Sequence, residues 1–314
     1  IVNLLRHFPG SALDEFDISL LANPGVDRAD FSAAIEKRAF RVIEQRVSPL
    51  GPRRDWDMHR FLDRHEREFD LIHIPSMAYP LSLRGGIWTI HDVTFKRWFH
   101  NPGNVPGAGH LAVAYLTRLV RSGLNNGQKM VAVSNSTRRE IEALFAPPAS
   151  QMAKIAVVYE GWEHLTDYHP ERCNDFRPTD SGYLFFLGSY RRHKNLGRLL
   201  EAFELALDCI PEGKTLVISG GSVKLSRELR ASLERLNARQ ERVQFTGLLS
   251  NDCVGRYYQE ADGFLFPSLA EGFGIPVLES FYYGTPLLSS RTTSIPEVAG
   301  DAAFYFDPFD PRSI

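Results

Sequence analysis

Cysteine is scarce in this chain, which contains three cysteines in 314 residues. Cys173, Cys209 and Cys253 lie far apart and form no C-x-x-C pair, so the sequence predicts neither a disulfide framework nor a zinc site. Because disulfides persist mainly in oxidising compartments, a reducing compartment such as the cytoplasm fits this pattern best.

Long apolar runs and a strong net charge are also absent. The sequence has no run of about 18 apolar residues and no signal-peptide pattern, so we expect a cytoplasmic protein, with peripheral contact at the inner face of the membrane left open. A formal net charge of −2 gives no general reason to expect nucleic acid as a partner. Neither half contains the G-x-G-x-x-G fingerprint, which argues against a dehydrogenase that uses NAD.

Apolar residues make up 43% of the chain, enough for substantial cores, and the length predicts one or two domains. In the second half, short apolar runs alternate with helical patterns, which predicts an α/β fold whose parallel sheet has helices on both faces. We expect strands at 183–187, 215–219, 243–245 and 263–266, and helices at 196–207, 226–238 and 252–260.

The first half shows the same two patterns less regularly. The first two apolar runs are too close for a parallel crossover, so we expect that the chain lacks a segment near residue 10. No period is visible from 161 to 179, which predicts a boundary between domains 1–165 and 166–314. We expect strands at 1–5, 16–22, 71–75, 86–90, 129–133 and 154–159, helices at 31–47, 56–69 and 111–124, and another opened by a capping box from Thr137 to Glu140.

The stretch 267–280 has the pattern of a ligand site, because a buried strand leads through a glycine loop into a helix. Gly272 and Gly274 let the backbone approach a bound group, and a helix N-terminus attracts anions. We expect Glu271 before this helix and Glu279 in its first turn, neither of them in the core, since an unpaired buried carboxylate is costly. Paired carboxylates suit the vicinal hydroxyls of a sugar or a ribose; alternatively, Glu279 only complements the helix dipole and Glu271 is solvated.

A second loop, 188–195, also joins a strand to a helix and carries three cations, Arg191, Arg192 and Lys194. Backbone N–H groups with arginine and lysine are suited to a diphosphate, although the loop could be an exposed basic turn. The glycines at 220–221 and Gly247 with Leu248 also end predicted strands, and there they could contact a nucleobase or be ordinary turns.

His91 follows the predicted strand 86–90, where open α/β sheets place their ligands. Its imidazole could bind a sugar hydroxyl or transfer a proton. From position alone, a packed or capping histidine with Asp92 as its partner is the alternative.

These segments resemble a known family. The run Glu271-Gly-Phe-Gly-Ile-Pro-Val-Leu-Glu279 is similar to the E-x7-E motif of the retaining glycosyltransferases of family 4, which have the GT-B fold. Residues 187–195 and 285–303 resemble its phosphate-binding segment and its downstream pattern, and 89–92 looks like its acceptor-domain histidine motif. The resemblance covers roughly residues 87 to 308.

The resemblance implies an α/β protein of the GT-B type, with two Rossmann-like domains whose parallel sheets face across a cleft. The first would bind the acceptor and the second a nucleotide-diphosphate sugar, whose hexosyl group moves to an acceptor hydroxyl with retention and without a metal or cofactor. Arg192 and Lys194 would hold the diphosphate. The other implied roles are Glu279 on the ribose, and Glu271 and His91 on the sugar. We expect the donor contacts to come from Gly188, Ser189, Asn195, Gly220, Gly247, Leu248, Gly272, Phe273, Gly274 and Ile275.

The loop departs from the family pattern at two positions. The family often has Gly-Arg early in the loop or an arginine before the lysine, where this chain has Ser189 and His193, so Arg192 is chosen over Arg191. The loop resembles those of polysaccharide-building mannosyltransferases, which suggests GDP-mannose as donor and a saccharide or lipid-linked saccharide as acceptor. Resembling proteins continue beyond 314 through further helices. A sugar-nucleotide epimerase of the same fold and a catalytically silent nucleotide-sugar-binding protein remain alternatives.

Overall fold

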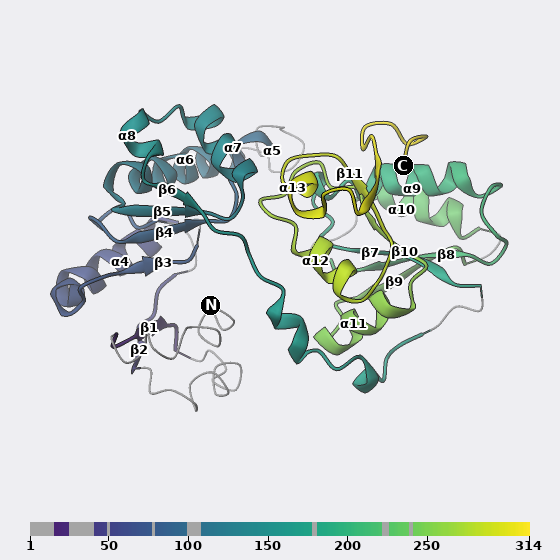
Figure 1. Ribbon diagram of the computed structural model, residues 1–314, viewed down its shortest axis with the longest axis horizontal. Helices are drawn as coiled ribbons and strands as arrows, with labels where there is room; N and C mark the ends of the chain where they lie inside the picture. The colour runs from purple at the N-terminus through teal and green to yellow at the C-terminus, as the bar shows by residue number, and fades with distance from the viewer. Residues whose placement is uncertain are drawn as a thin grey trace. The chain divides into compact units, whose positions relative to one another are not determined.

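The computed structural model describes residues 16–24, 41–48, 51–76, 79–98, 108–177, 181–221, 226–238 and 241–314 (Figure 1). Internal contacts divide the chain into two compact units. Unit 1 comprises Ile1–Ile90, Pro102–Val131 and Phe145–Ala156, and unit 2 comprises His91–Asn101, Ala132–Leu144 and Val157–Ile314. The predicted domain boundary near residue 165 stays a prediction.

Unit 1 is built on a sheet of four short strands in the order β3 (His73–Ile74), β4 (Ile87–Ile90), β5 (Lys129–Ala132) and β6 (Ile155–Val157). Its helices are α4 (Pro52–His65), followed by the short η1 (Glu66–Glu68), α6 (Ala108–Asn126) and α8 (Ala149–Met152). Trp88 is fully buried against α6, where a Cβ at Gly123 would lie 2.3 Å from the indole ring. The strands expected at 71–75, 86–90, 129–133 and 154–159 and the helices expected at 56–69 and 111–124 are all present, although their ends differ from the predicted ones.

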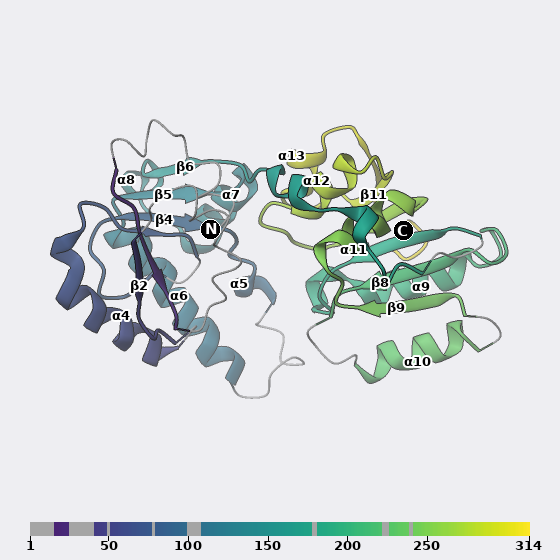
Figure 2. The same cartoon turned by 90° about the horizontal axis from the view of Figure 1, so that it is seen from below.

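A two-stranded sheet, β1 (Ser19–Ala22) and β2 (Arg41–Glu44), also belongs to unit 1, and its strands run parallel in Figure 2. The prediction of a helix at 31–47 is wrong in its last part, since 41–44 is a strand. Val42 and Ile43 fit helical spacing, but they are also β-branched, and their backbone pairs with Leu20 and Leu21. Residues 45–47 are described and are not helical either, whereas the predicted helical residues 31–40, the strand at 1–5 and the suspected missing segment lie outside the described residues.

Unit 2 contains a fully parallel sheet of six strands in the order β12 (Ala303–Phe306), β11 (Leu287–Ser290), β10 (Gly263–Phe266), β7 (Tyr183–Leu187), β8 (Thr215–Ser219) and β9 (Val243–Gly247). Phe185 and Phe264 point into one core, with α11 (Asn251–Glu260), α12 (Ile275–Tyr282) and α13 (Ile295–Ala299). Phe186 and Leu265 point into the other, with α9 (Leu196–Ala206) and α10 (Arg227–Leu236). The predicted parallel sheet with helices on both faces is confirmed, and Figure 1 shows α9 and α10 on the side opposite α11.

Two short elements from the first half of the sequence, α5 (Phe95–Trp98) and most of α7 (Asn135–Phe145), belong to unit 2 by their contacts. The predicted capping box is wrong. Helix α7 begins two residues before Thr137, and the backbone N–H of Thr137 donates to Ser134 Oγ at 2.9 Å, so Ser134 is the capping residue. Glu140 does not reach back to a helix terminus, because it pairs with Arg97 instead.

The expectation that no disulfide forms is also wrong. Cys173 and Cys253 form one, 80 residues apart in sequence, which joins the short helix η3 (Pro170–Arg172) and α11. Sequence spacing gave no sign of this pair, because only folding brings the two Cα atoms to 4.8 Å. Cys209 is free and exposed. The inference of a reducing compartment thus loses its basis.

Candidate active site

Three glycines mark the carboxyl ends of neighbouring strands of the unit 2 sheet. Gly188 follows β7 and donates its N–H to Ser219 O at 3.1 Å, and Gly220 follows β8 and donates to Gly247 O at 2.8 Å. Gly220 has a φ of 107°, and a Cβ there would lie 2.4 Å from Gly188 O. Because side chains are missing at these positions, backbone groups form this edge of the sheet. Leu248, which follows Gly247, is 78% exposed beside it.

The loop after β7 carries the cations that the sequence singled out. Arg191 and Arg192 are exposed, whereas Lys194 is largely covered. Its Nζ lies 2.6 Å from Glu271 Oε1, with 16% and 13% of the two side chains exposed, and 5.5 Å from the centre of the Phe266 ring. The structure therefore brings together two predicted site residues that are 77 positions apart.

Backbone and hydroxyl hydrogen bonds fix Glu271. Its N–H donates to Thr293 Oγ1 at 2.9 Å, and Ser294 Oγ donates to its carbonyl at 3.0 Å. Thr293 has a φ of 47°, a left-handed conformation that is rare for a β-branched residue. Such strain occurs where the surrounding structure needs a particular side-chain position. Neither Thr293 nor Ser294 was among the predicted site residues. The only indication of them in the sequence was their position in segment 285–303, which resembles the downstream pattern of the family.

The loop of Lys194 is joined to the strand end before Glu271 by a hydrogen bond from the N–H of Leu269 to His193 O at 2.7 Å. Burial lowers the pKa of the His193 imidazole, and the nearby charge of Lys194 acts in the same direction, while Glu271 opposes both. At neutral pH His193 is therefore uncharged, and the positive charge of this loop comes from its lysine and arginines.

His91 lies directly beside the glycine loop. The His91 carbonyl is so close to Gly272 that a Cβ at this glycine would lie 1.8 Å from its oxygen. Its Nδ1 is 2.7 Å from Glu160 Oε1, and 46% of the side chain is exposed. A carboxylate partner places a proton on Nδ1 and orients the ring. Glu160 was not predicted, and no motif in the sequence marks it.

Helix α7 holds the same loop from its first turn. The carbonyl of Gly272 accepts hydrogen bonds from Ser134 Oγ at 2.6 Å and Thr137 Oγ1 at 2.9 Å. Glu297 in turn accepts from the N–H groups of Asn135 at 2.6 Å and Ser136 at 2.9 Å. Burial alone would raise the pKa of Glu297, but these hydrogen bonds outweigh it and lower the pKa.

Glu279 is placed differently from the prediction. It is the fifth residue of α12, beyond the first turn, and it is buried, with 8% of its surface exposed. The core tolerates it because Tyr258 donates its hydroxyl to Oε2 at 2.9 Å, while His164 Nε2 lies 3.8 Å from Oε1. Burial and then the Glu279 carboxylate raise the pKa of Tyr258 well above its ordinary value.

The remaining predicted residues are mostly parts of the loop framework. Phe273 is 5% exposed and packs on the Tyr159 ring, and Gly274, with a φ of 109°, precedes Ile275 at the start of α12. Asn195 is left-handed and buried, and its amide donates to Pro308 O at 2.7 Å, while Ser189 is half-buried. Their contacts with a donor stay predictions.

Two family models match the chain. Residues 3–163 match "Glycosyltransferase Family 4", which is about half of the sequence, and residues 181–314 match "Glycosyl transferases group 1". The chain belongs to glycosyltransferase family 4. The resemblance found in the motifs is thereby confirmed, as is the prediction that the protein is a glycosyltransferase.

Curated relatives of this family 4 protein include two that are named as O-antigen chain mannosyltransferases. "O-antigen chain mannosyltransferase B" from Escherichia coli is 28% identical over 84% of this chain and 67% of its own length. Mannosyltransferase RfbU from Salmonella typhimurium is 23% identical over 74% of this chain and 59% of its own. Another Escherichia coli relative, the serotype-specific mannosyltransferase WbdA, is 27% identical over 64% of this chain, but the match covers only 25% of the length of WbdA.

Solved structures show the fold. Sucrose-phosphate synthase from Thermosynechococcus elongatus superposes with a TM-score of 0.69 at 16% identity, covering 99% of this chain and 80% of that one. Anabaena HepE gives a TM-score of 0.65 at 16% identity, covering 95% and 87%. The predicted GT-B type, with parallel sheets in two Rossmann-like halves, is confirmed.

Two features are absent from the described part of the chain. No group of three or more histidine, cysteine, aspartate or glutamate side chains there is arranged to hold a metal ion. None of the helices there combines the length and apolar character that a membrane crossing requires.

Proposed function

We propose that this glycosyltransferase moves a hexosyl group from a nucleotide-diphosphate sugar to an acceptor hydroxyl, with retention of anomeric configuration. The observation that carries this proposal is the ion pair of Lys194 and Glu271, set at the carboxyl edge of a parallel sheet beside His91 and a glycine-lined backbone. Open α/β sheets bind their ligands at this edge. We assign donor binding to residues 166–314 and acceptor binding to residues 1–165.

The diphosphate would be held by charge and by backbone. Lys194 supplies a point charge and the exposed Arg192 a guanidinium fork, and backbone N–H groups between Ser189 and His193 would add hydrogen bonds to the phosphates. Neutralising the charge that develops on the departing diphosphate is the main catalytic contribution in this proposal, which requires no metal or cofactor.

The two motif glutamates take different parts of the donor. Glu279 already has Tyr258 on Oε2, so Oε1 would accept from the ribose hydroxyls. Glu271, held by Thr293, would bind the donor sugar together with the loop amides. His91, oriented by Glu160, would contact a hydroxyl of the same sugar.

For the donor we propose GDP-mannose, and for the process the synthesis of a polysaccharide or glycoconjugate at the cytoplasmic side of a membrane, on a saccharide or lipid-linked saccharide acceptor. Two relatives named as O-antigen chain mannosyltransferases support this choice. Structures of HepE "in complex with UDP and glucose" and with UDP-glucose support a nucleotide sugar as the general substrate class.

Calorimetry with GDP, UDP and dTDP tests the donor site, and transfer from the corresponding sugars, with product anomers assigned by NMR, tests the reaction. We expect binding of at least GDP and an α-linked product from GDP-α-mannose. If the folded protein binds no nucleoside diphosphate, the proposal fails. Turnover of a UDP- or dTDP-sugar without turnover of GDP-mannose would overturn the choice of donor alone.

A further inference from the structure

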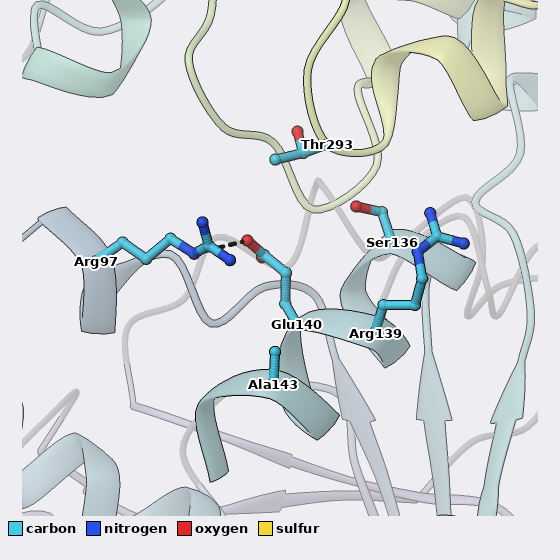
Figure 3. A pocket seen from close by; sticks show the side chains of 6 residues that line it. All are labelled: Arg97, Ser136, Arg139, Glu140, Ala143 and Thr293. Carbon is cyan, nitrogen blue, oxygen red and sulfur yellow. Dashed lines mark ion pairs between the residues drawn. The ribbon is translucent and has the colours of Figure 1, made fainter. Parts of the chain in front are cut away.

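A pocket of about 300 Å³ opens in unit 2 beside the candidate active site (Figure 3). Three elements form it: α5, one face of α7, and the loop that precedes α13. Its wall carries two guanidinium groups, one carboxylate and two hydroxyls. The lining residues are Arg97, Ser136, Arg139, Glu140, Ala143 and Thr293.

Glu140 is the unusual member of this wall. Only 6% of its surface is exposed, and within the described residues neither carboxylate oxygen receives a hydrogen bond. The Arg97 guanidinium approaches Oε1 to 3.2 Å as an ion pair, from a side chain that is itself half exposed. Buried carboxylates are usually satisfied by several donors, so this one has unused capacity to accept hydrogen bonds.

The pocket is continuous with the groups proposed to act on the donor sugar. Thr293 lines it and also accepts the N–H of Glu271 at 2.9 Å. Ser136 lies in the first turn of α7, the turn that holds the carbonyl of Gly272. Helix α5 starts four residues after His91. A group in this pocket would thus lie against the framework of the proposed catalytic residues.

The chemistry of the wall selects among ligands. A buried carboxylate needs hydrogen-bond donors and repels phosphate, while guanidinium groups need acceptors. A sugar hydroxyl is both donor and acceptor, and several of them on one ring match a wall that contains carboxylate, guanidinium and hydroxyl groups. An isolated anion would accept hydrogen bonds from Arg97 and Arg139, but it would repel the carboxylate of Glu140 and offer it no hydrogen-bond donor.

We propose that this pocket is the acceptor subsite, in which one hexose unit of the acceptor saccharide donates hydroxyl hydrogen bonds to Glu140 and accepts them from Arg97 and Arg139. The naming of this sugar as the acceptor rests on the proposed function. The binding of a saccharide in the pocket does not, and it can be measured without any donor.

The test uses the whole chain and methyl α-D-mannopyranoside and methyl α-D-glucopyranoside as probes, with binding followed by saturation-transfer NMR. Glu140→Gln keeps the shape of the side chain but removes its charge and one acceptor. Its matched control is Glu142→Gln, which changes an exposed carboxylate on the same helix. We expect Glu140→Gln to weaken glycoside binding by about tenfold or more and Glu142→Gln to leave it unchanged, since hydrogen bonds to charged groups are strong.

A second pair of variants guards against misfolding of the first. Arg97→Ala changes a half-exposed side chain of the pocket, and Arg138→Ala changes an arginine of α7 that does not line it. We expect weaker glycoside binding only in the former. Equal affinities within either pair of folded variants, or no glycoside binding by the wild type, would overturn the subsite. These glycoside-binding results test only the subsite. The proposed function is tested separately, by nucleotide binding and by sugar transfer.

Discussion

The ion pair of Lys194 and Glu271 leads to a prediction about nucleotide affinity. At 2.6 Å, two unit charges attract by about 6 kcal/mol if the effective dielectric constant is about 20. Desolvation of side chains that are 16% and 13% exposed offsets most of this attraction. A diphosphate that binds Lys194 must compete with Glu271 for the ammonium group and lie near its carboxylate.

The two partners should therefore have opposite effects. Lys194→Ala removes a charged hydrogen bond to the diphosphate that is worth about 1.5–3 kcal/mol. Part of this loss is offset, because the variant no longer has to break the ion pair with Glu271 when the nucleotide binds. We therefore expect nucleoside diphosphate affinity to fall by about tenfold. Glu271→Gln frees the lysine and removes repulsion, so we expect affinity to rise by up to about tenfold while transfer falls. Glu260→Gln, which breaks an exposed pair with Arg256, is the control.

Calorimetry with GDP and UDP on the three variants, with transfer rates measured alongside, decides the matter. Weakening by Glu271→Gln as large as that by Lys194→Ala would show that the carboxylate helps to hold the nucleotide, and the argument from competition would be wrong. Unchanged affinity in Lys194→Ala would remove the lysine from the diphosphate site.

Three further variants test the frame of the site. Gly272→Ala places a Cβ 1.8 Å from His91 O, so we expect a loss of about 1–3 kcal/mol in stability, seen as a lower Tm, and reduced transfer. Tyr258→Phe leaves the buried Glu279 without its hydroxyl donor, so it should cost about 1–3 kcal/mol in stability, and an unchanged Tm would contradict this. Burial raises the pKa of Glu140 above its ordinary value of 4.5, so ionisation of this carboxyl group destabilises the folded wild type as the pH rises above 4.5. Glu140→Gln cannot ionise, so its Tm should exceed that of the wild type by an amount that grows from pH 4 to pH 8. A difference in Tm that stays constant over this range would contradict the argument.

The regular part of the fold could be predicted because its signal is local. The strands at 183–187, 215–219 and 263–266 match the prediction to the residue, since each is a short apolar run bounded by glycine or polar residues. Side chains that alternate between the two cores make such runs apolar throughout, as Phe185 and Phe186 illustrate.

The errors arose where distant segments decide the structure. Residues 41–44 have apolar positions that suit a helix, but pairing with Leu20 and Leu21 makes them a strand. Cys173 finds Cys253 only because η3 packs on α11. Local patterns carry no information about either partner.

The candidate site shows the same limit at the level of single side chains. Glu271 and Glu279 have similar signals in the sequence, yet one is paired with a lysine at the sheet edge and the other is buried against a tyrosine. Their partners lie 77 and 21 positions away, so neither environment follows from the motif that contains both residues. A motif therefore predicts which residue types meet a ligand. The charge state of these residues and the contacts that compete with the ligand set the affinity, and both depend on hydroxyl and carboxylate partners from the rest of the fold.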